Sequence, residues 1–211
     1  YEFNLLDDII INEVLGEVQK LSYTNNTINL ISEEMYYHRG LFDWIGSCLE
    51  EVRKIYYIDD VSLTITSAWV NKTFKTGMHH KHVHPNSLVS GCFYLTTHES
   101  SNIKFSTPNP WVTQFNGFVL DRKSFNVLTC NKNDDCEIET MIKPQRGKLL
   151  IFPSNLAHRV TSLNMDEKET RYSIAFNTFP SGLIGRDNIT GQVHIKPKTI
   201  EEMINQSKEN K

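Results

Sequence analysis

The stretch GKLLIFPSNLAHRVTSLNMDEKETRYSIAFN, residues 147–177, decides the fold. Apolar and β-branched residues gather in short runs that are interrupted by a Pro-Ser turn and by a charged segment, 164–170. This spacing is typical of consecutive β-strands. The runs at 158–163 and 171–177 flank the charged segment and predict a β-hairpin.

Arg171, Ser173, Ala175 and Asn177 alternate along the last run, so a strand places these four side chains on one face. That face can look into a barrel alongside His158. An arginine fork meets a carboxylate in two parallel hydrogen bonds, and a neighbouring serine hydroxyl adds a third donor. The pair therefore indicates a carboxylate clamp. The alternative is that Arg171 only balances the charge of the preceding acids, Asp166, Glu167 and Glu169.

The rest of the chain predicts helices followed by many strands. Apolar residues recur at helical spacing over 7–21 and 41–55. Alternating patterns then predict strands near 61–74, 78–84, 87–97, 101–106, 116–121, 136–142, 147–152, 157–162 and 171–178. We expect a mainly β sandwich or barrel supported by N-terminal helices, and a short helix at 199–205.

Length and charge set the broad class. A chain of 211 residues fits one domain, with helical support at 1–60, a β core at 61–179 and a C-terminal extension at 180–211. The net charge of −3 favours neither nucleic acid nor an anionic membrane as a partner. The apolar runs are too short to span a membrane and the start lacks a signal-peptide pattern, so we expect a soluble, cytoplasmic protein. The oligomeric state stays open, a homodimer included.

Four histidines lie within six residues: His79, His80, His82 and His84. On a strand, His80, His82 and His84 would share one face and His79 would face away toward solvent or packing. Two imidazoles on one rigid face can chelate a metal ion. The alternative is a polar edge strand whose histidines are solvated.

The acid that usually accompanies two histidines around ferrous iron is missing. From Val61 to His98 there is no Asp or Glu. Either His84 takes the third position, or water or an anion fills it. An imidazole in place of a carboxylate leaves the site one charge unit more positive, which weakens Fe(II) retention but favours an anionic cosubstrate.

Several motifs together resemble the Fe(II)- and 2-oxoglutarate-dependent oxygenases, in particular small proteins of phages and marine bacteria. The motifs are Trp69-Val70-Asn71, His82-x-His84-Pro85-Asn86-Ser87, Ser90-Gly91-x-x-Tyr94, Phe152-Pro153-Ser154 and Arg171-x-Ser173-x-Ala175-Phe176-Asn177. The resemblance implies a double-stranded β-helix, the cupin-like jelly roll. It implies that His82 and His158 bind iron, with His84 where the family has an acid. It also implies that Arg171 and Ser173 bind 2-oxoglutarate, with Tyr94 and Asn86 as further contacts.

The expected activity is therefore a dioxygenase reaction that uses Fe(II), 2-oxoglutarate and O2. It would hydroxylate an unidentified substrate and release succinate and CO2, with no catalytic side chain beyond the metal ligands. Two alternatives stay open: a non-catalytic jelly-roll binding module, and a cupin-type metalloenzyme that does not use 2-oxoglutarate. The segment 108–135 is long enough to be a substrate lid.

Overall fold

A computed structural model describes most of the chain. The described residues are 1–24, 26–30, 39–55, 61–74, 77–98, 102–108, 128–129, 137–161, 169–185, 191–198, 202, 205, 206 and 209. The predicted strand at 116–121 lies outside them, as do most of the predicted lid and of the predicted helix at 199–205. No helix within the described ranges is long and apolar enough to cross a membrane.

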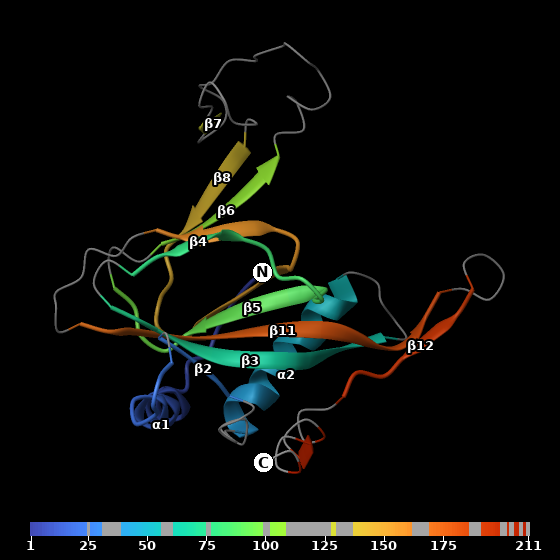
Figure 1. The fold of residues 1–211 in the computed structure, drawn as a ribbon, viewed down its shortest axis with the longest axis horizontal. Coiled ribbons are helices and arrows are strands. Elements are labelled where there is room, and N and C mark those ends of the chain that lie inside the picture. The colour runs from blue at the N-terminus through green and yellow to red at the C-terminus, as the bar shows by residue number, and fades with distance from the viewer. Residues whose placement is uncertain are drawn as a thin grey trace.

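The described strands form two antiparallel sheets that lie one above the other in Figure 1. The larger sheet has the order β1 (Glu2–Asn4), β9 (Lys148–Pro153), β5 (Val89–Tyr94), β11 (Arg171–Ile184), β3 (Val61–Thr73) and β2 (Thr27–Asn29), and β12 (Val193–Ile195) also pairs with β11. The smaller sheet has the order β4 (His79–His82), β10 (Ala157–Val160), β6 (Ile103–Pro108), β8 (Glu137–Ile142) and β7 (Leu128–Thr129). The mainly β architecture expected from the sequence is confirmed.

The predicted hairpin between 158–163 and 171–177 is wrong. β10 pairs with β4 and β6 in the smaller sheet, whereas β11 pairs with β3 and β5 in the larger one. A period of two shows which face of a strand is apolar, but it carries no information about the neighbouring strand. The chain crosses from one sheet to the other between these strands, so β10 and β11 contribute opposite walls of the same interior.

Helices α1 (Asp8–Val18) and α2 (Arg39–Ile55) cover the outer face of the larger sheet (Figure 1). Alternate residues of the central strands face them, as Phe93 and Phe176 do in the main core cluster. The residues between them face the smaller sheet, where Tyr94 belongs to a second cluster. The two faces of the larger sheet therefore have separate roles: one is packed against helices and the other borders the space between the sheets.

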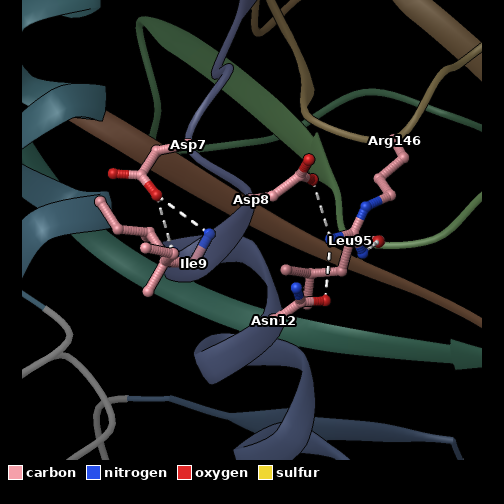
Figure 2. A network of polar contacts seen from close by, with 7 residues as sticks. Asp7, Asp8, Ile9, Asn12, Leu95 and Arg146 are labelled. Atoms are coloured by element: carbon pink, nitrogen blue, oxygen red, sulfur yellow. Dashed lines mark hydrogen bonds and ion pairs between the residues drawn. The ribbon is translucent and has the colours of Figure 1, made fainter.

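Arg146 fixes α1 to the sheet (Figure 2). Its guanidinium donates to the side-chain oxygens of Asp8 at 3.2 Å and Asn12 at 3.0 Å, and to the backbone oxygen of Leu95 at 3.2 Å. Asp7 caps the helix by accepting hydrogen bonds from two backbone N–H groups of the first turn. These contacts bring the start of α1 close to the turn before β9.

Some elements end at other residues than predicted. α1 ends at Val18 rather than at residue 21. β11 continues to Ile184 because β12 pairs with its far end. The short strands β1, β2 and β12 have three residues each, too few for an alternating pattern to predict them, and they pair with longer strands.

Gly91 is a position where only glycine fits. A Cβ atom there would lie 2.2 Å from the Phe176 ring, which is fully buried against the helices. We expect Gly91→Ala to lower the free energy of unfolding by about 1–3 kcal/mol, because the ring and the backbone must shift. Urea unfolding measures this loss.

Gly46→Ala is the matched control, because no atom lies within 4 Å of the Cβ position at this exposed residue of α2. Alanine favours the helix interior, so this variant should gain up to about 1 kcal/mol. An unfolding midpoint for Gly91→Ala at or above that of the unaltered protein would contradict the close packing between β5 and β11.

Candidate functional site

Three histidines meet between the two sheets. His82 ends β4 and lies directly opposite His158 on β10, with ring centroids 4.4 Å apart. His84 follows just beyond the end of β4, and its ring stacks against that of His158 at 5.0 Å. One ligand atom from each imidazole lies within 4.8 Å of the others. The arrangement can hold one metal ion.

A β-bulge changes which other histidine shares this site. Between the pairs His158–His82 and Val160–His79, β4 advances three residues while β10 advances two. The extra residue places His79 in the pocket beside His82, whereas His80 is exposed. The prediction that His80 faces the site and His79 faces away is wrong, because it assumed an unbroken alternation.

Each Nδ1 atom of the three ligand candidates has an oxygen partner. Nδ1 of His82 lies 2.7 Å from the backbone oxygen of His80, and Nδ1 of His158 lies 3.0 Å from that of Leu156. Nδ1 of His84 lies 2.8 Å from Oδ1 of Asn177. An oxygen acceptor requires the proton on Nδ1. In each neutral ring, Nε2 therefore carries a lone pair.

These lone pairs converge. Nε2 of His84 and Nε2 of His158 are 3.2 Å apart. With both protons on Nδ1, the two Nε2 atoms repel unless a cation lies between them. A transition metal bound about 2.1 Å from two nitrogens at right angles separates them by about 3 Å. The donor set therefore fits a metal ion bound through Nε2 atoms.

Burial keeps His84 and His158 uncharged at neutral pH. Burial, with the neighbouring His82, lowers the pKa of His84, although the hydrogen bond that its ring donates to Asn177 raises it. Burial lowers the pKa of His158 to about 4, and the phenyl rings of Phe105 and Phe152 contact it at centroid distances of 5.7 and 4.8 Å. Neutral imidazoles are the form that binds a metal ion.

The shift at His158 predicts acid sensitivity of the metal-free protein. The folded pKa of about 4 lies below the unfolded value of about 6.5, so the unfolded chain binds more protons between them. The stabilising contribution is present above about pH 6.5 and is lost as pH falls toward 4. We expect the free energy of unfolding to drop by about 2 kcal/mol between pH 7.5 and pH 5 from this residue alone.

His158→Asn removes the titrating ring and should flatten this part of the pH profile. Urea unfolding of both proteins at the two pH values, with a chelator present, makes the comparison. An equal pH dependence in the two proteins would rule out His158 as the cause.

A positive charge lies at the other side of the same pocket. Arg171 begins β11, is only 3% exposed, and lies with its guanidinium carbon 5.9 Å from the centroid of the Tyr94 ring. Ser173 is buried one pleat along, facing Tyr94 across the strand pair. Burial raises the pKa of the Cys92 thiol, against the effects of Arg171 and of hydrogen bonds with Tyr94 and Ser173. Arginine, hydroxyl groups and thiol thus form one polar cluster.

The histidines and this cluster share one pocket. It is lined by Trp69, Asn71, His79, His82, His84, Gly91, Cys92, Tyr94, Ile103, Phe152, His158, Val160, Arg171, Ser173 and Ala175. None of these lining residues is Asp or Glu, so the guanidinium makes the pocket favourable for an anion.

Asn86 is not brought to this pocket. It lies in an exposed turn after Pro85 and adopts a left-handed backbone conformation with φ of 54°. Asparagine tolerates that conformation, which gives Asn86 a structural role in the turn.

Some pocket residues had no predicted role. Asn71 pairs with Ser173 in register, and its place on the pocket face follows from the alternation along β3. Asn177 was predicted on the pocket face but not as a partner of His84. His79 gave no sequence signal, because the bulge that turns it inward depends on pairing with β10.

A family model described as "Putative 2OG-Fe(II) oxygenase" matches residues 67–177. This range runs from β3 to Asn177 on β11 and contains the three histidines and Arg171. No curated protein matches the sequence.

Several solved structures share the fold. The non-heme alpha ketoglutarate dependent epimerase SnoN from nogalamycin biosynthesis has a TM-score of 0.56 at 10% identity, over 92% of this chain and 86% of its own. HygX from Streptomyces hygroscopicus, with nickel and 2-oxoglutarate bound, has a TM-score of 0.52 at 12% identity, over 92% and 91%. The alpha ketoglutarate dependent carbocyclase SnoK has a TM-score of 0.54 at 11% identity, over 86% and 80%. These likenesses confirm the expected jelly roll.

Proposed function

The chain belongs to the 2OG-Fe(II) oxygenase family, and on that premise we propose that it hydroxylates a substrate while converting 2-oxoglutarate and O2 to succinate and CO2. The observation that carries this proposal is the shared pocket. Three imidazoles with anchored Nδ1 atoms line one part of it, and a buried arginine lines another.

His82, His84 and His158 are the proposed iron ligands. Three neutral nitrogen donors leave coordination positions for the cosubstrate and for O2. Without a carboxylate ligand the centre keeps the full charge of Fe(II), which favours a dianionic cosubstrate and weakens metal retention relative to a site with an acid.

Arg171 is the proposed partner of the distal carboxylate of 2-oxoglutarate, and Ser173 and Tyr94 are further contacts. The guanidinium supplies charge and a planar pair of donors. Its packing against Tyr94 and its burial restrict its rotamers, so the carboxylate meets a donor fork that is already oriented.

When bound, iron and 2-oxoglutarate supply the oxidising chemistry, and the protein positions the parts. Trp69 stacks on His84 with ring centroids 5.7 Å apart, and Phe152 packs on His158. These aromatic walls limit water around the ligands and restrict ring rotation. Hydroxylation requires no acid or base from a side chain, in agreement with a pocket whose lining residues include no Asp or Glu.

Succinate production tests the proposal. The protein with Fe(II), 2-oxoglutarate and O2 should release succinate and CO2 slowly even without its substrate, and chelator or exclusion of O2 should stop the release. Iron-loaded protein that forms no succinate at millimolar 2-oxoglutarate would instead favour a non-catalytic jelly-roll module or a cupin-type metalloenzyme. A substrate found by screening should gain one oxygen atom in mass spectrometry; an isomerised or cyclised product would overturn hydroxylation.

A further inference from the structure

Asn177 differs from the other groups that anchor the histidines. His82 and His158 are each anchored by the backbone oxygen of the residue two positions earlier in the chain. His84 lies beyond the end of β4 and reaches across to β11, where Oδ1 of Asn177 lies 2.8 Å from its Nδ1. This anchor is a side chain, so it can be changed without altering the backbone.

The carboxamide of Asn177 is itself oriented. Ser90 on β5 donates to the same Oδ1 atom at 2.8 Å, and Ser154 lies 2.7 Å from the Ser90 hydroxyl. Ser90 and Ser154 are both almost fully buried. A hydroxyl donor on Oδ1 keeps the amide oxygen, rather than the amide nitrogen, toward the imidazole.

The backbone around Asn177 is also irregular at this point. The register between β11 and β3 shifts between Asn177 and Thr178, which leaves Thr66 as an extra residue on β3. Such bulges re-aim a side chain. The Thr66 hydroxyl donates to the backbone oxygen of Asn177 at 3.5 Å, which ties the bulge to this residue.

Other contacts hold the backbone and the ring plane of His84, and the contact with Asn177 determines which way the ring nitrogens point. The His84 backbone N–H donates to the Ser154 oxygen at 2.9 Å, and its ring lies stacked against both Trp69 and His158. Rotating the ring by half a turn would keep this stacking but would remove Nε2 from the cluster. The hydrogen bond to Asn177 disfavours that rotation and the opposite tautomer.

We propose that Asn177 is a positioning residue that fixes His84 as the Nδ1–H tautomer and thereby makes it the third metal ligand. This inference rests on the proposed iron site. An amide, unlike a carboxylate, adds no negative charge behind the imidazole, so the centre keeps the positive charge that suits an anionic cosubstrate. In this chain His84, hydrogen-bonded to the uncharged Asn177 amide, thus stands where the family has an acidic ligand.

Asn177→Ala, Asn177→Asp and Asn12→Ala test the proposal in two measurements. Anaerobic Fe(II) titration gives the metal affinity, and ¹⁵N NMR of the metal-free protein gives the tautomer of His84. Asn12 is the matched control, since its amide oxygen accepts from Arg146 on the helix side of the larger sheet.

We expect Asn177→Ala to weaken Fe(II) binding by about 10- to 100-fold and to mix the His84 tautomers. Asn177→Asp keeps the acceptor, so its affinity should equal or exceed that of the unaltered protein with the Nδ1–H tautomer intact. Asn12→Ala should leave both quantities unchanged.

The inference is overturned if Asn177→Ala retains the affinity and the tautomer, or if Asn177→Asp loses as much as Asn177→Ala. Failure of the proposed function looks different: the unaltered protein would then bind no Fe(II), or would bind Fe(II) but form no succinate from 2-oxoglutarate. In that case the tautomer measurement on metal-free protein still decides whether Asn177 orients His84.

Discussion

Arg171→Ala should raise the dissociation constant of 2-oxoglutarate at least about 30-fold, while Fe(II) binding changes little. Removing one partner of a buried, hydrogen-bonded charge pair typically loses about 2–5 kcal/mol, and each 1.4 kcal/mol corresponds to a factor of ten. Arg171 is buried in the pocket on β11, whereas the histidines lie on and beside β4 and β10. Anaerobic calorimetry with 2-oxoglutarate on metal-loaded protein gives the constant.

Arg171→Lys separates charge from geometry in the same experiment. Lysine keeps the positive charge but lacks the planar fork of donors. The 2-oxoglutarate affinity of Arg171→Lys should therefore fall between those of Arg171→Ala and the unaltered protein. Unchanged 2-oxoglutarate affinity in Arg171→Ala would exclude the clamp. If Arg171→Ala weakened Fe(II) binding as much as 2-oxoglutarate binding, Arg171 would not act on the cosubstrate alone. Thermal unfolding of the variant would then show whether the fold is lost.

His84→Ala should weaken Fe(II) binding by at least about tenfold, because one of three nitrogen donors is removed. The remaining donors, His82 and His158, hold the ion less firmly. The measurement is an anaerobic titration monitored by competition with a chelating dye of known affinity.

His80→Ala is the control for this variant. His80 is an exposed histidine of the same sequence run as His82 and His84. It contributes to the site only its backbone oxygen, which the substitution retains. Its Fe(II) affinity should match that of the unaltered protein. If His84→Ala also matches it, His84 is not a ligand, and water or an anion completes the coordination.

On β11, the local pattern was enough to predict which side chains share a face. The period of two along β11 correctly grouped Arg171, Ser173 and Ala175 on the pocket side, because each alternates with a residue of the helix-facing core. The same rule holds for Cys92 and Tyr94 on β5, which both line the pocket. Side-chain alternation depends on the backbone of one strand only, so the sequence contains it.

Features that depend on two strands were not predictable. β10 and β11 belong to different sheets because they pair with different strands. The residues of the two strands would show the same local pattern if they formed a hairpin. The inward turn of His79 needs the bulge opposite β10. The bond between Asn177 and His84 joins residues 93 positions apart. Each of these three features depends on which strands pair, and the sequence of one segment does not specify its partner strand.

The most direct measurement for a three-histidine centre that holds 2-oxoglutarate is visible absorption under anaerobic conditions. Adding Fe(II) and then 2-oxoglutarate should produce a weak charge-transfer band that saturates at one iron per chain, because the cosubstrate chelates the ion that the histidines hold. Protein that binds Fe(II) yet shows no such band at millimolar 2-oxoglutarate would contradict the account.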